Sequence, residues 1–178
     1  MDICRLDSPV GTLLLASEED ALCGLWLEGQ KYFAAGLSGN AAENPNAPVL
    51  RAAADWLMRY FAGEQPAISE LPLRPKGSAF RQEVWQLLCE IPYGETVSYG
   101  ALSKALARRI GRDTMSAQAV GGAVGHNPIS VIIPCHRVVG ADGSLTGYAG
   151  GVNKKLWLLR HEGAMQSGFY LPTKGTAL

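Results

Sequence analysis

The stretch of residues 66–77 constrains the fold most, because it divides the sequence into two halves with different patterns. It holds prolines at positions 66, 72 and 75 and shows neither a helical nor an alternating apolar pattern. Proline has no backbone N–H and a fixed φ, so such a stretch is unfavourable in a helix or a central strand. We interpret it as a linker and expect two domains, residues 1–74 and 75–178.

Strand-like and helical patterns are unequally shared between these halves. In the first half, apolar residues 12–16 and Ala21–Leu27 flank an acidic turn, which predicts a small antiparallel meander. Apolar residues at helical spacing over Pro48–Phe61 add one amphipathic helix. The second half is predicted to form helices over residues 80–90, 99–107, 115–124 and 153–162. We therefore expect a mixed α/β fold of the α+β kind, with strands in the first domain and helices in the second.

Hydroxyl side chains mark the starts of two of these helices. Ser98 precedes residues 99–107 and Thr114 precedes residues 115–124, and such side chains accept from the free N–H groups of a first helical turn. Two short helices joined by a basic, glycine-containing stretch are typical of a helix-turn-helix, which binds DNA in many proteins. The connection is longer than the usual turn of about three or four residues.

The charge of the chain is balanced overall but not along its length. Residues 1–74 carry five Lys and Arg against ten Asp and Glu, whereas residues 75–178 carry eleven against six. Chance combined with solvated charged faces is one explanation. The other is that the second half presents a surface to phosphate groups while the first half does not.

The helix predicted over residues 115–124 has little side-chain bulk. It contains Ala117 and the adjacent glycines Gly121 and Gly122, and a glycine inside a helix costs roughly 0.5–1 kcal/mol relative to alanine. Two neighbouring glycines call for a compensating gain, which is either close packing against another helix or close approach to a nucleic-acid backbone. Only Gln118 offers a long polar side chain for reading bases, so we expect little sequence preference.

The segment around Cys135 carries the strongest chemical signal. The β-branched run of residues 130–133 predicts a strand, and Pro134 suits the first turn of a following helical turn. A cysteine there lies close to free backbone N–H groups, which favour the thiolate, as do His136 and Arg137. Neighbouring side chains on a helical turn diverge by about 100°, so we expect His136 to reach the thiol through a water. The alternative is a buried cysteine that acts only as a small hydrophobic residue.

A histidine that acts as a base needs an orienting partner, and Glu162 is the candidate. It ends the helix predicted over residues 153–162, directly before Gly163 at the C′ position. A carboxylate there opposes the helix dipole by about 0.3–1 kcal/mol. A hydrogen bond from His136 explains this position, and a solvated surface glutamate is the alternative.

The cysteines and histidines form no metal-binding pattern. Cys4, Cys23, Cys89 and Cys135 are scattered without a C-x-x-C pair, and the histidines lie far from the first two. We therefore expect free thiols and no metal. The N-terminal sequence has no apolar run of the kind a secretory signal requires, and no apolar stretch is long enough to span a membrane. These features favour a cytoplasmic protein.

The sequence IPCHRV at residues 133–138 resembles the active-site signature of the O6-alkylguanine-DNA alkyltransferases. Further matches at the family's spacing are VGGA at residues 120–123, NP at 127–128, GYAGG at 147–151, WLLRHEG at 157–163 and Tyr99. The resemblance is strong over residues 80–163 and looser before, where LDSPVG at residues 6–11 is similar to the family's opening. It implies a ribonuclease-H-like first domain and a winged helix-turn-helix second domain.

This resemblance implies DNA repair by irreversible transfer of an alkyl group from guanine O6 to the protein itself, without a cofactor. Cys135 is then the acceptor, His136 the base that acts through a water, and Glu162 the residue that orients the base. Asn127 is expected to tie the cysteine turn to the helix-turn-helix. The implied protein acts once, because the thioether that forms is not a leaving group.

The resemblance also implies a pocket for a guanine flipped out of the duplex, since the reactive carbon is unreachable inside a stacked helix. Tyr99 is expected to donate to a ring nitrogen of that base. The carbonyls of Cys135 and Val138 are expected to accept from its exocyclic amine. The N–H of Ala149 is expected to face O6, with Tyr148 in the same pocket.

The implied partner is double-stranded DNA that contains O6-alkylguanine, with O4-alkylthymine as a second candidate substrate. We expect a monomer without an obligate protein partner. DNA contacts are expected from Ala117, Gln118, Gly121, Gly122, Arg112 and Arg137, with further phosphate contacts from Lys104, Arg108 or Arg109. The family often has arginine where Gln118 stands and serine where Ala149 stands, and some members bind zinc through a first-half ligand set that is missing here.

Three other functions fit parts of this pattern. A hydrolase with a Cys-His-Glu triad shares the same residues but leaves the basic second half and the small-residue helix unexplained. A relative that binds lesions without repairing them would lack the acceptor thiol. A structural DNA-binding module requires that Cys135 is buried and inert.

Overall fold

The computed structural model describes residues 1–37 and 39–173. Two compact units divide the chain. The first contains Met1–Lys76 together with Pro128–Ile132, and the second contains Gly77–Asn127 and the described residues from Ile133 onward. Residues 128–132 therefore belong to the first unit although they lie far along the second half of the sequence.

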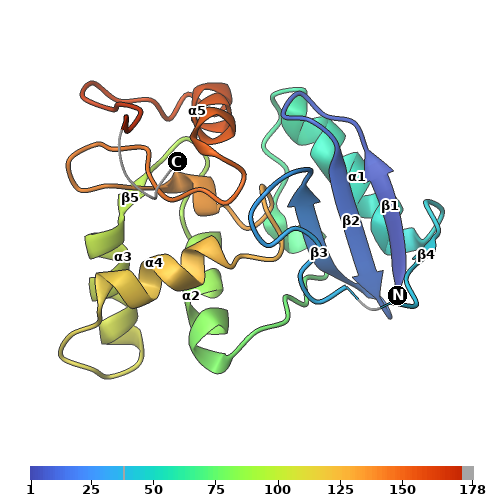
Figure 1. The fold of residues 1–178 in the computed structure, drawn as a ribbon, viewed down its shortest axis with the longest axis horizontal. Helices are drawn as coiled ribbons and strands as arrows, with labels where there is room; N and C mark the ends of the chain where they lie inside the picture. The colour runs from blue at the N-terminus through green and yellow to red at the C-terminus, as the bar shows by residue number, and fades with distance from the viewer. Residues whose placement is uncertain (38, 174–178) are drawn as a thin grey trace. The chain divides into compact units, whose positions relative to one another are not determined.

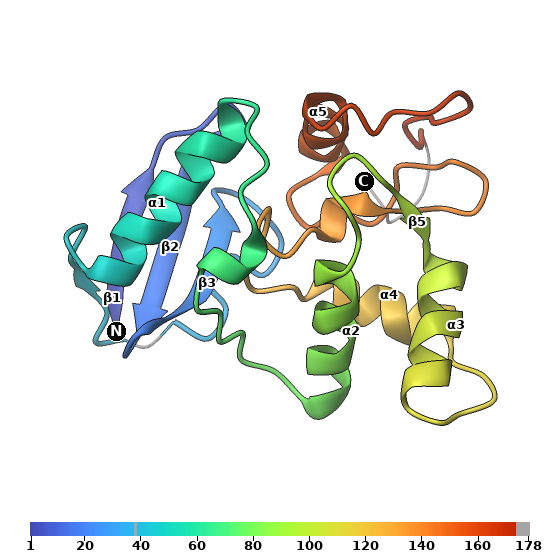
Figure 2. The ribbon, with the colours of Figure 1, turned by 180° about the vertical axis from the view of Figure 1, so that it is seen from behind.

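The first unit is a four-stranded sheet with one long helix on a face. The strands are β1 (Asp2–Leu6), β2 (Leu13–Glu18), β3 (Ala21–Leu27) and β4 (Ala42–Glu43). Their order is β3-β2-β1-β4, in which the first three run antiparallel and β4 pairs in parallel with β1. Figure 2 shows α1 (Pro48–Phe61) lying across one face of this sheet. The meander and the helix are confirmed, but β1 was missed because Asp2 and Arg5 interrupt its apolar residues.

The other face of the sheet is covered as well, which is why β2 and β3 are almost continuously apolar. Leu14, Ala16, Cys23 and Trp26 form a buried cluster there. The Trp26 ring lies over Gly24, where a Cβ would come within 2.0 Å of the ring. Any larger residue at this position would displace the tryptophan from the sheet.

The stretch of residues 66–77 is more ordered than the linker that the sequence indicated. It contains a short 3₁₀ helix, η1 (Ile68–Glu70), and then runs beside β3. The Leu22 N–H donates to the Pro72 carbonyl and the Arg74 N–H donates to the Leu22 carbonyl, both at 2.8 Å. Pro72 and Pro75 are compatible with this pairing, because the N–H group that donates to β3 belongs to Arg74, which is not a proline.

The second unit is helical, as expected. Its helices are α2 (Ala79–Cys89), α3 (Tyr99–Arg109), α4 (Ala117–Gly125) and α5 (Val152–His161). The first three pack against one another (Figure 1), and the Trp85 indole N–H donates to the Ala123 carbonyl at 2.9 Å between α2 and α4. Strands β5 (Val97–Ser98) and β6 (Val138–Val139) form a small parallel pair. The predicted cap at Ser98 is confirmed, since its hydroxyl accepts from the Ala101 N–H at 3.1 Å.

Two predictions in this unit are wrong. The helix expected from residue 115 with Thr114 as its cap begins at Ala117 instead, because the Ser116 hydroxyl accepts from the Ala119 N–H. The strand expected over residues 130–133 is a buried turn.

Backbone conformation explains why that apolar run is not a strand. Val131 has a φ of +69°, in the left-handed region, and the Ile132 N–H donates to the Ser130 carbonyl at 2.8 Å. The backbone of this segment pairs with β3 at Leu25, whose N–H donates to the Pro128 carbonyl and whose carbonyl accepts from the Ser130 N–H. All four residues of the run are buried. A buried turn can be as rich in apolar residues as a buried strand, so the sequence pattern does not distinguish them.

Candidate active site

Cys135 begins a single 3₁₀ turn, η2 (Cys135–Arg137), with Pro134 at its N-cap. The predicted helical turn is therefore confirmed, with the proline one position earlier than expected. Cys135 is 4% exposed. The Asn127 side-chain amide donates to the Ile133 carbonyl at 2.8 Å and to the Cys135 Sγ at 3.2 Å. Asn127 thus joins the end of α4 to the cysteine turn.

His136 and Glu162 form a buried pair beside this turn. The His136 Nε2 lies 2.7 Å from Glu162 Oε1, and neither side chain is accessible to solvent. Glu162 is the C-cap residue of α5, and Gly163 follows with a φ of +67°, as predicted for a C′ glycine. Of the two interpretations left open for Glu162, the structure favours the hydrogen-bonded one.

Arg137 completes a buried charge cluster. Its guanidinium donates to both oxygens of Glu162, at 2.8 and 3.0 Å, and to the Ile91 carbonyl at 2.6 Å. Arg137 is 6% exposed. The expectation that it contacts DNA is therefore corrected, because the guanidinium is occupied within the second unit.

Ionisation in this cluster favours a neutral histidine and an ionised glutamate. Burial raises the pKa of Glu162, but hydrogen bonds from His136 and Arg137 outweigh that effect and hold the pKa far below its usual range. Burial lowers the pKa of His136, opposed by Glu162. A neutral imidazole whose Nε2–H donates to Glu162 has an unprotonated Nδ1, which can accept a proton.

The surroundings of the Cys135 thiol favour its protonated form. Burial raises its pKa, opposed by the Asn127 hydrogen bond, the Lys155 ammonium and the backbone N–H groups of Cys135 and His136. The backbone contribution agrees with the interpretation of the sequence. Desolvation outweighs these contributions, and the cation that acts on Cys135 is Lys155 rather than the Arg137 indicated by the sequence.

Lys155 is the residue of the site that sequence reasoning missed. It is fully buried, and its Nζ donates to the carbonyls of Val138 and Thr146 at 2.5 and 2.6 Å. These bonds connect α5 to β6, which follows the cysteine turn, and to the loop that leads to Tyr148. A signal was present, since Lys155 is spaced with Val152 and Leu159 along the buried face of α5.

We expect Lys155 to make stability depend on pH. Burial lowers its pKa from 10.5 to about 8, so between these values the unfolded chain holds a proton that the folded chain has released. Stability rises with pH wherever the unfolded state binds more protons. The free energy of unfolding of the wild type, compared with Lys155→Met, should therefore rise by roughly 3 kcal/mol between pH 8 and pH 10.5. Urea unfolding at several pH values measures this, and a constant difference between the proteins would contradict it.

Tyr99 stands at the first position of α3 and reaches the loop that follows β6. Its hydroxyl donates to the carbonyls of Thr146 and Gly147, both at 3.3 Å. Gly147 has a φ of +79°, and a Cβ there would come within 2.3 Å of the Tyr99 hydroxyl oxygen. Burial and the Cys135 charge both raise the pKa of Tyr99, so its hydroxyl is a donor rather than an anion.

The other predicted pocket residues lie on the same loop and turn. Tyr148 is 6% exposed, and its ring stands edge-on to His136 with the ring centroids 6.5 Å apart. Ala149 follows it and is half-buried, while Val138 is fully buried in β6. The structure therefore brings Tyr99, Tyr148 and Val138 to the surroundings of Cys135.

Several small residues of α4 are exposed rather than packed, although Ala123 is buried. Ala117, Gln118 and Gly122 face solvent, and a Cβ at Gly122 would meet nothing within 4 Å. Gly121 faces Tyr99, where a Cβ would lie 3.8 Å from the ring. Helix packing, one of the two explanations left open, therefore does not account for Gly122.

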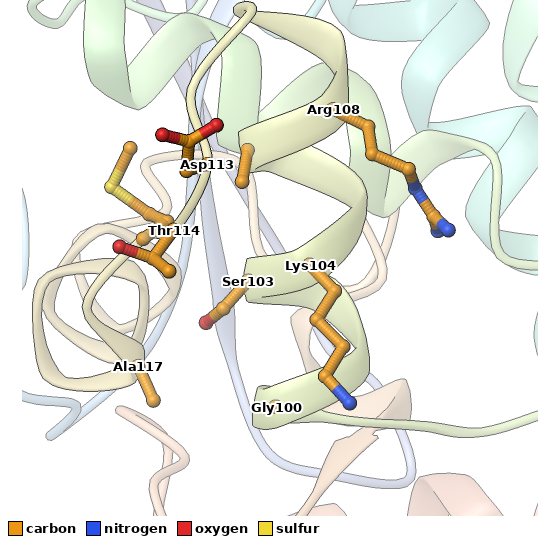
Figure 3. A pocket seen from close by; sticks show the side chains of 9 residues that line it. Gly100, Ser103, Lys104, Arg108, Asp113, Thr114 and Ala117 are labelled. Atoms are coloured by element: carbon orange, nitrogen blue, oxygen red, sulfur yellow. The ribbon is translucent and has the colours of Figure 1, made fainter.

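A groove of about 500 Å³ lies beside this helix, between α3 and the connection that leads into α4 (Figure 3). Figure 3 shows Lys104 and Arg108 extending from α3 on the side away from Asp113 and Thr114. Lys104, Arg108 and Arg112 are all exposed, whereas Arg109 pairs with Glu90. The residues that line the groove are distinct from those around Cys135.

Within residues 1–37 and 39–173, no group of three or more His, Cys, Asp or Glu side chains is placed to hold a metal ion. None of the helices described is long and apolar enough to cross a membrane.

A buried cysteine next to a histidine that is held by a carboxylate is an arrangement found in proteins that use cysteine as a nucleophile. Comparison with known proteins shows which family of cysteine nucleophiles this chain belongs to. Residues 5–75 match the 6-O-methylguanine DNA methyltransferase ribonuclease-like domain, and residues 79–164 match the DNA binding domain of the same family. The chain therefore belongs to the 6-O-methylguanine DNA methyltransferase family, which confirms the family and the fold class expected from the sequence.

Individual relatives agree with this assignment. The methylated-DNA–protein-cysteine methyltransferase of Haemophilus influenzae is 44% identical over 161 residues, which cover 87% of this chain and 82% of the relative. The enzyme of the same name from Mycobacterium tuberculosis is 46% identical over 158 residues, covering 88% and 89%. The crystal structure of Mycobacterium tuberculosis OGT in complex with DNA superposes with a TM-score of 0.78 at 42% identity, covering 92% of this chain and 94% of that one.

Proposed function

We propose that this protein repairs DNA by transferring the alkyl group of O6-alkylguanine irreversibly to its own Cys135. The observation that carries the assignment is the Cys135 thiol held by Asn127 beside the buried His136–Glu162 pair. These residues stand in a chain whose two halves both match the methyltransferase family. O6-Methylguanine is the proposed substrate, with larger O6-alkyl groups and O4-alkylthymine as further candidates.

The proposed reaction begins with a proton relay. The Cys135 thiol gives its proton to a water, which passes a proton to His136 Nδ1, while Glu162 stabilises the imidazolium that results. In the described part of the chain His136 Nδ1 is buried and has no hydrogen-bond partner, as a position that binds such a water requires. The thiolate then attacks the alkyl carbon, and the electron pair of the broken carbon–oxygen bond passes to the guanine.

The leaving guanine needs donors and acceptors that stabilise its departing form. We propose that Tyr99 donates to a ring nitrogen and that the Ala149 N–H faces O6. The carbonyls of Cys135 and Val138 accept from the exocyclic amine. Lys155 supports this set, because it binds the carbonyl of Val138 and that of Thr146, two residues before Tyr148.

DNA is proposed to meet the second unit along α4. Ala117, Gln118, Gly121 and Gly122 form a low surface that admits a sugar–phosphate backbone. Exposed Lys104, Arg108 and Arg112 on α3 and its connection to α4 supply phosphate contacts. We also propose that the protein acts in the cytoplasm as a monomer.

The decisive experiment is the intact mass of the protein after incubation with an oligonucleotide that contains one O6-methylguanine. We expect a stoichiometric gain of one methyl group that maps to Cys135 and is absent in Cys135→Ala. Tight binding of the lesion without a mass gain would replace repair by lesion recognition. A mass gain on another residue would refute the assignment of Cys135, and turnover of an ester or amide substrate would favour a hydrolase.

Replacing Gly122 should change stability and DNA binding in opposite directions. Alanine in the middle of a helix is favoured over glycine by roughly 0.5–1 kcal/mol, and the site has room for it. Gly122→Ala should therefore raise the free energy of unfolding by about that amount. Gly122→Leu should weaken DNA binding about tenfold, because the added side chain separates α4 from the backbone. Urea unfolding and fluorescence anisotropy measure the two effects, and unchanged DNA affinity in the leucine variant would argue against contact at Gly122.

A further inference from the structure

Two buried polar atoms beside Cys135 have no partner. Within the described residues, His136 Nδ1 and the Tyr148 hydroxyl are the buried side-chain nitrogen and oxygen atoms without a hydrogen bond. An unpaired buried polar group costs about 1–3 kcal/mol, so such groups are rare in native proteins. That both belong to neighbouring rings, with centroids 6.5 Å apart and edge-on geometry, indicates a shared cause.

We propose that the Tyr148 hydroxyl holds the water that connects Cys135 to His136, which makes Tyr148 a positioning residue of the relay. This inference rests on the proposed function and adds a residue to it. A buried water typically makes about three hydrogen bonds. Cys135, His136 and the neighbouring Tyr148 offer three such partners, and two of these, His136 Nδ1 and the Tyr148 hydroxyl, are otherwise unpaired.

Electrostatic surroundings support this placement. Burial raises the pKa of Tyr148 well above its ordinary value and the charges of Cys135 and Glu162 add to this effect, so the hydroxyl stays protonated. The other charged or titratable groups around this point are His136, Arg137, Lys155 and Tyr99. A protonated phenol can donate to the water oxygen while the water donates to His136 Nδ1.

The proton transfer balances with this third partner. The thiol of Cys135 gives its proton to the water oxygen as the water gives one of its own protons to His136 Nδ1. Tyr148 keeps its proton and continues to donate to the water oxygen throughout. This donation polarises the water and strengthens its hydrogen bond to the new thiolate, so it stabilises the thiolate–imidazolium state more than the resting state.

The test compares wild type, Tyr148→Phe and Tyr170→Phe. The control removes a hydroxyl that donates to Asp142 on the surface, away from Cys135. Alkylation of Cys135 by iodoacetamide, followed by peptide mass spectrometry across pH 6 to 10, reports thiolate formation without DNA. Single-turnover methyl transfer from an O6-methylguanine oligonucleotide reports the reaction itself.

We expect the pH midpoint of alkylation to move upward in Tyr148→Phe and both rates at pH 7 to fall about threefold to tenfold. Tyr170→Phe should match wild type. An unchanged pH profile together with a higher melting temperature would overturn the inference, because removing a truly unpaired hydroxyl stabilises a protein. Absence of methyl transfer in wild type would instead refute the proposed function, and the two failures are therefore distinguishable.

Discussion

Replacing Glu162 by glutamine should destabilise the protein by about 3–5 kcal/mol, the usual cost of removing one partner of a buried ion pair. Glutamine keeps the shape of the side chain but leaves the buried Arg137 guanidinium without a counter-charge. His136 also loses the carboxylate that stabilises its imidazolium. Methyl transfer should therefore slow by about 10²-fold, the lower end of what a positioned general base contributes.

The same substitution in an exposed pair provides the control. Glu90 pairs with Arg109 on the surface, and such pairs contribute about 0–1 kcal/mol, so Glu90→Gln should leave stability and transfer almost unchanged. Adding Arg137→Met to Glu162→Gln should recover part of the stability, because both buried charges are then gone. Urea unfolding and single-turnover kinetics measure these effects. If Glu162→Gln lowers the free energy of unfolding by less than about 1 kcal/mol, the Glu162–Arg137 pair is not as desolvated as its burial indicates.

Acid should reduce the difference between wild type and Glu162→Gln. His136 and Arg137 hold the pKa of Glu162 far below the 4.5 of an unperturbed glutamate. The carboxylate therefore contributes stability that is complete above that value and is lost as the pH falls towards its folded pKa. The wild type should lose stability steeply below pH 4.5, whereas the glutamine variant lacks this contribution.

Gly147→Ala should have the second large effect, on the reaction more than on the fold. The new Cβ would stand 2.3 Å from the Tyr99 hydroxyl oxygen and 3.2 Å from the ring carbon that bears it. Relief of this contact requires the ring of Tyr99, the first residue of α3, to move by about 1 Å. Misplacement of that size can cost about 10²-fold in rate, and we expect a loss of that order in methyl transfer.

Gly168 offers a matched control. It has a φ of +92°, comparable with the +79° of Gly147, but a Cβ there meets nothing within 4 Å. Gly168→Ala should share the backbone strain of about 1–2 kcal/mol and leave the transfer rate unchanged. Tyr99→Phe should make Gly147→Ala less harmful if the two act through the same hydroxyl. Equal rates of methyl transfer for Gly147→Ala and wild type would show that the position of the Tyr99 ring does not affect the reaction.

Local rules in the sequence were sufficient for most elements. Helix α1 was predicted at its observed bounds, because Pro48 suits a first helical turn and the apolar spacing ends at Phe61. Strand β3 was likewise predicted from its apolar run. The start of α4 was misplaced because Thr114 and Ser116 are both good caps, and only the packed structure selects between them.

Two errors in the site have a common physical origin. The apolar run of residues 130–133 was interpreted as a strand, and Arg137 was interpreted as a DNA contact. Burial explains both, since apolar character reports that a segment is inside and not its backbone conformation. A charged side chain can also be fully buried when its partners are distant in sequence, as Glu162 is from Arg137.

The ionisation of Cys135 shows the same limit. Neighbours in the sequence favour the thiolate, but burial by residues far along the chain raises the pKa of Cys135. Lys155 was missed for a similar reason, because its partners Val138 and Thr146 belong to a strand and a loop elsewhere in the chain.

The pairing of Pro128–Ile132 with the first unit limits how this protein can be divided. A fragment that begins at Gly77 retains this excursion of the chain but lacks β3, against which it is held. Ile129, Val131 and Ile132, all at most 1% exposed in the whole protein, would then face water a few residues before Cys135. A single cut before Gly77 therefore exposes apolar side chains close to the reactive cysteine, and redesign of this excursion is the direct way to prevent it.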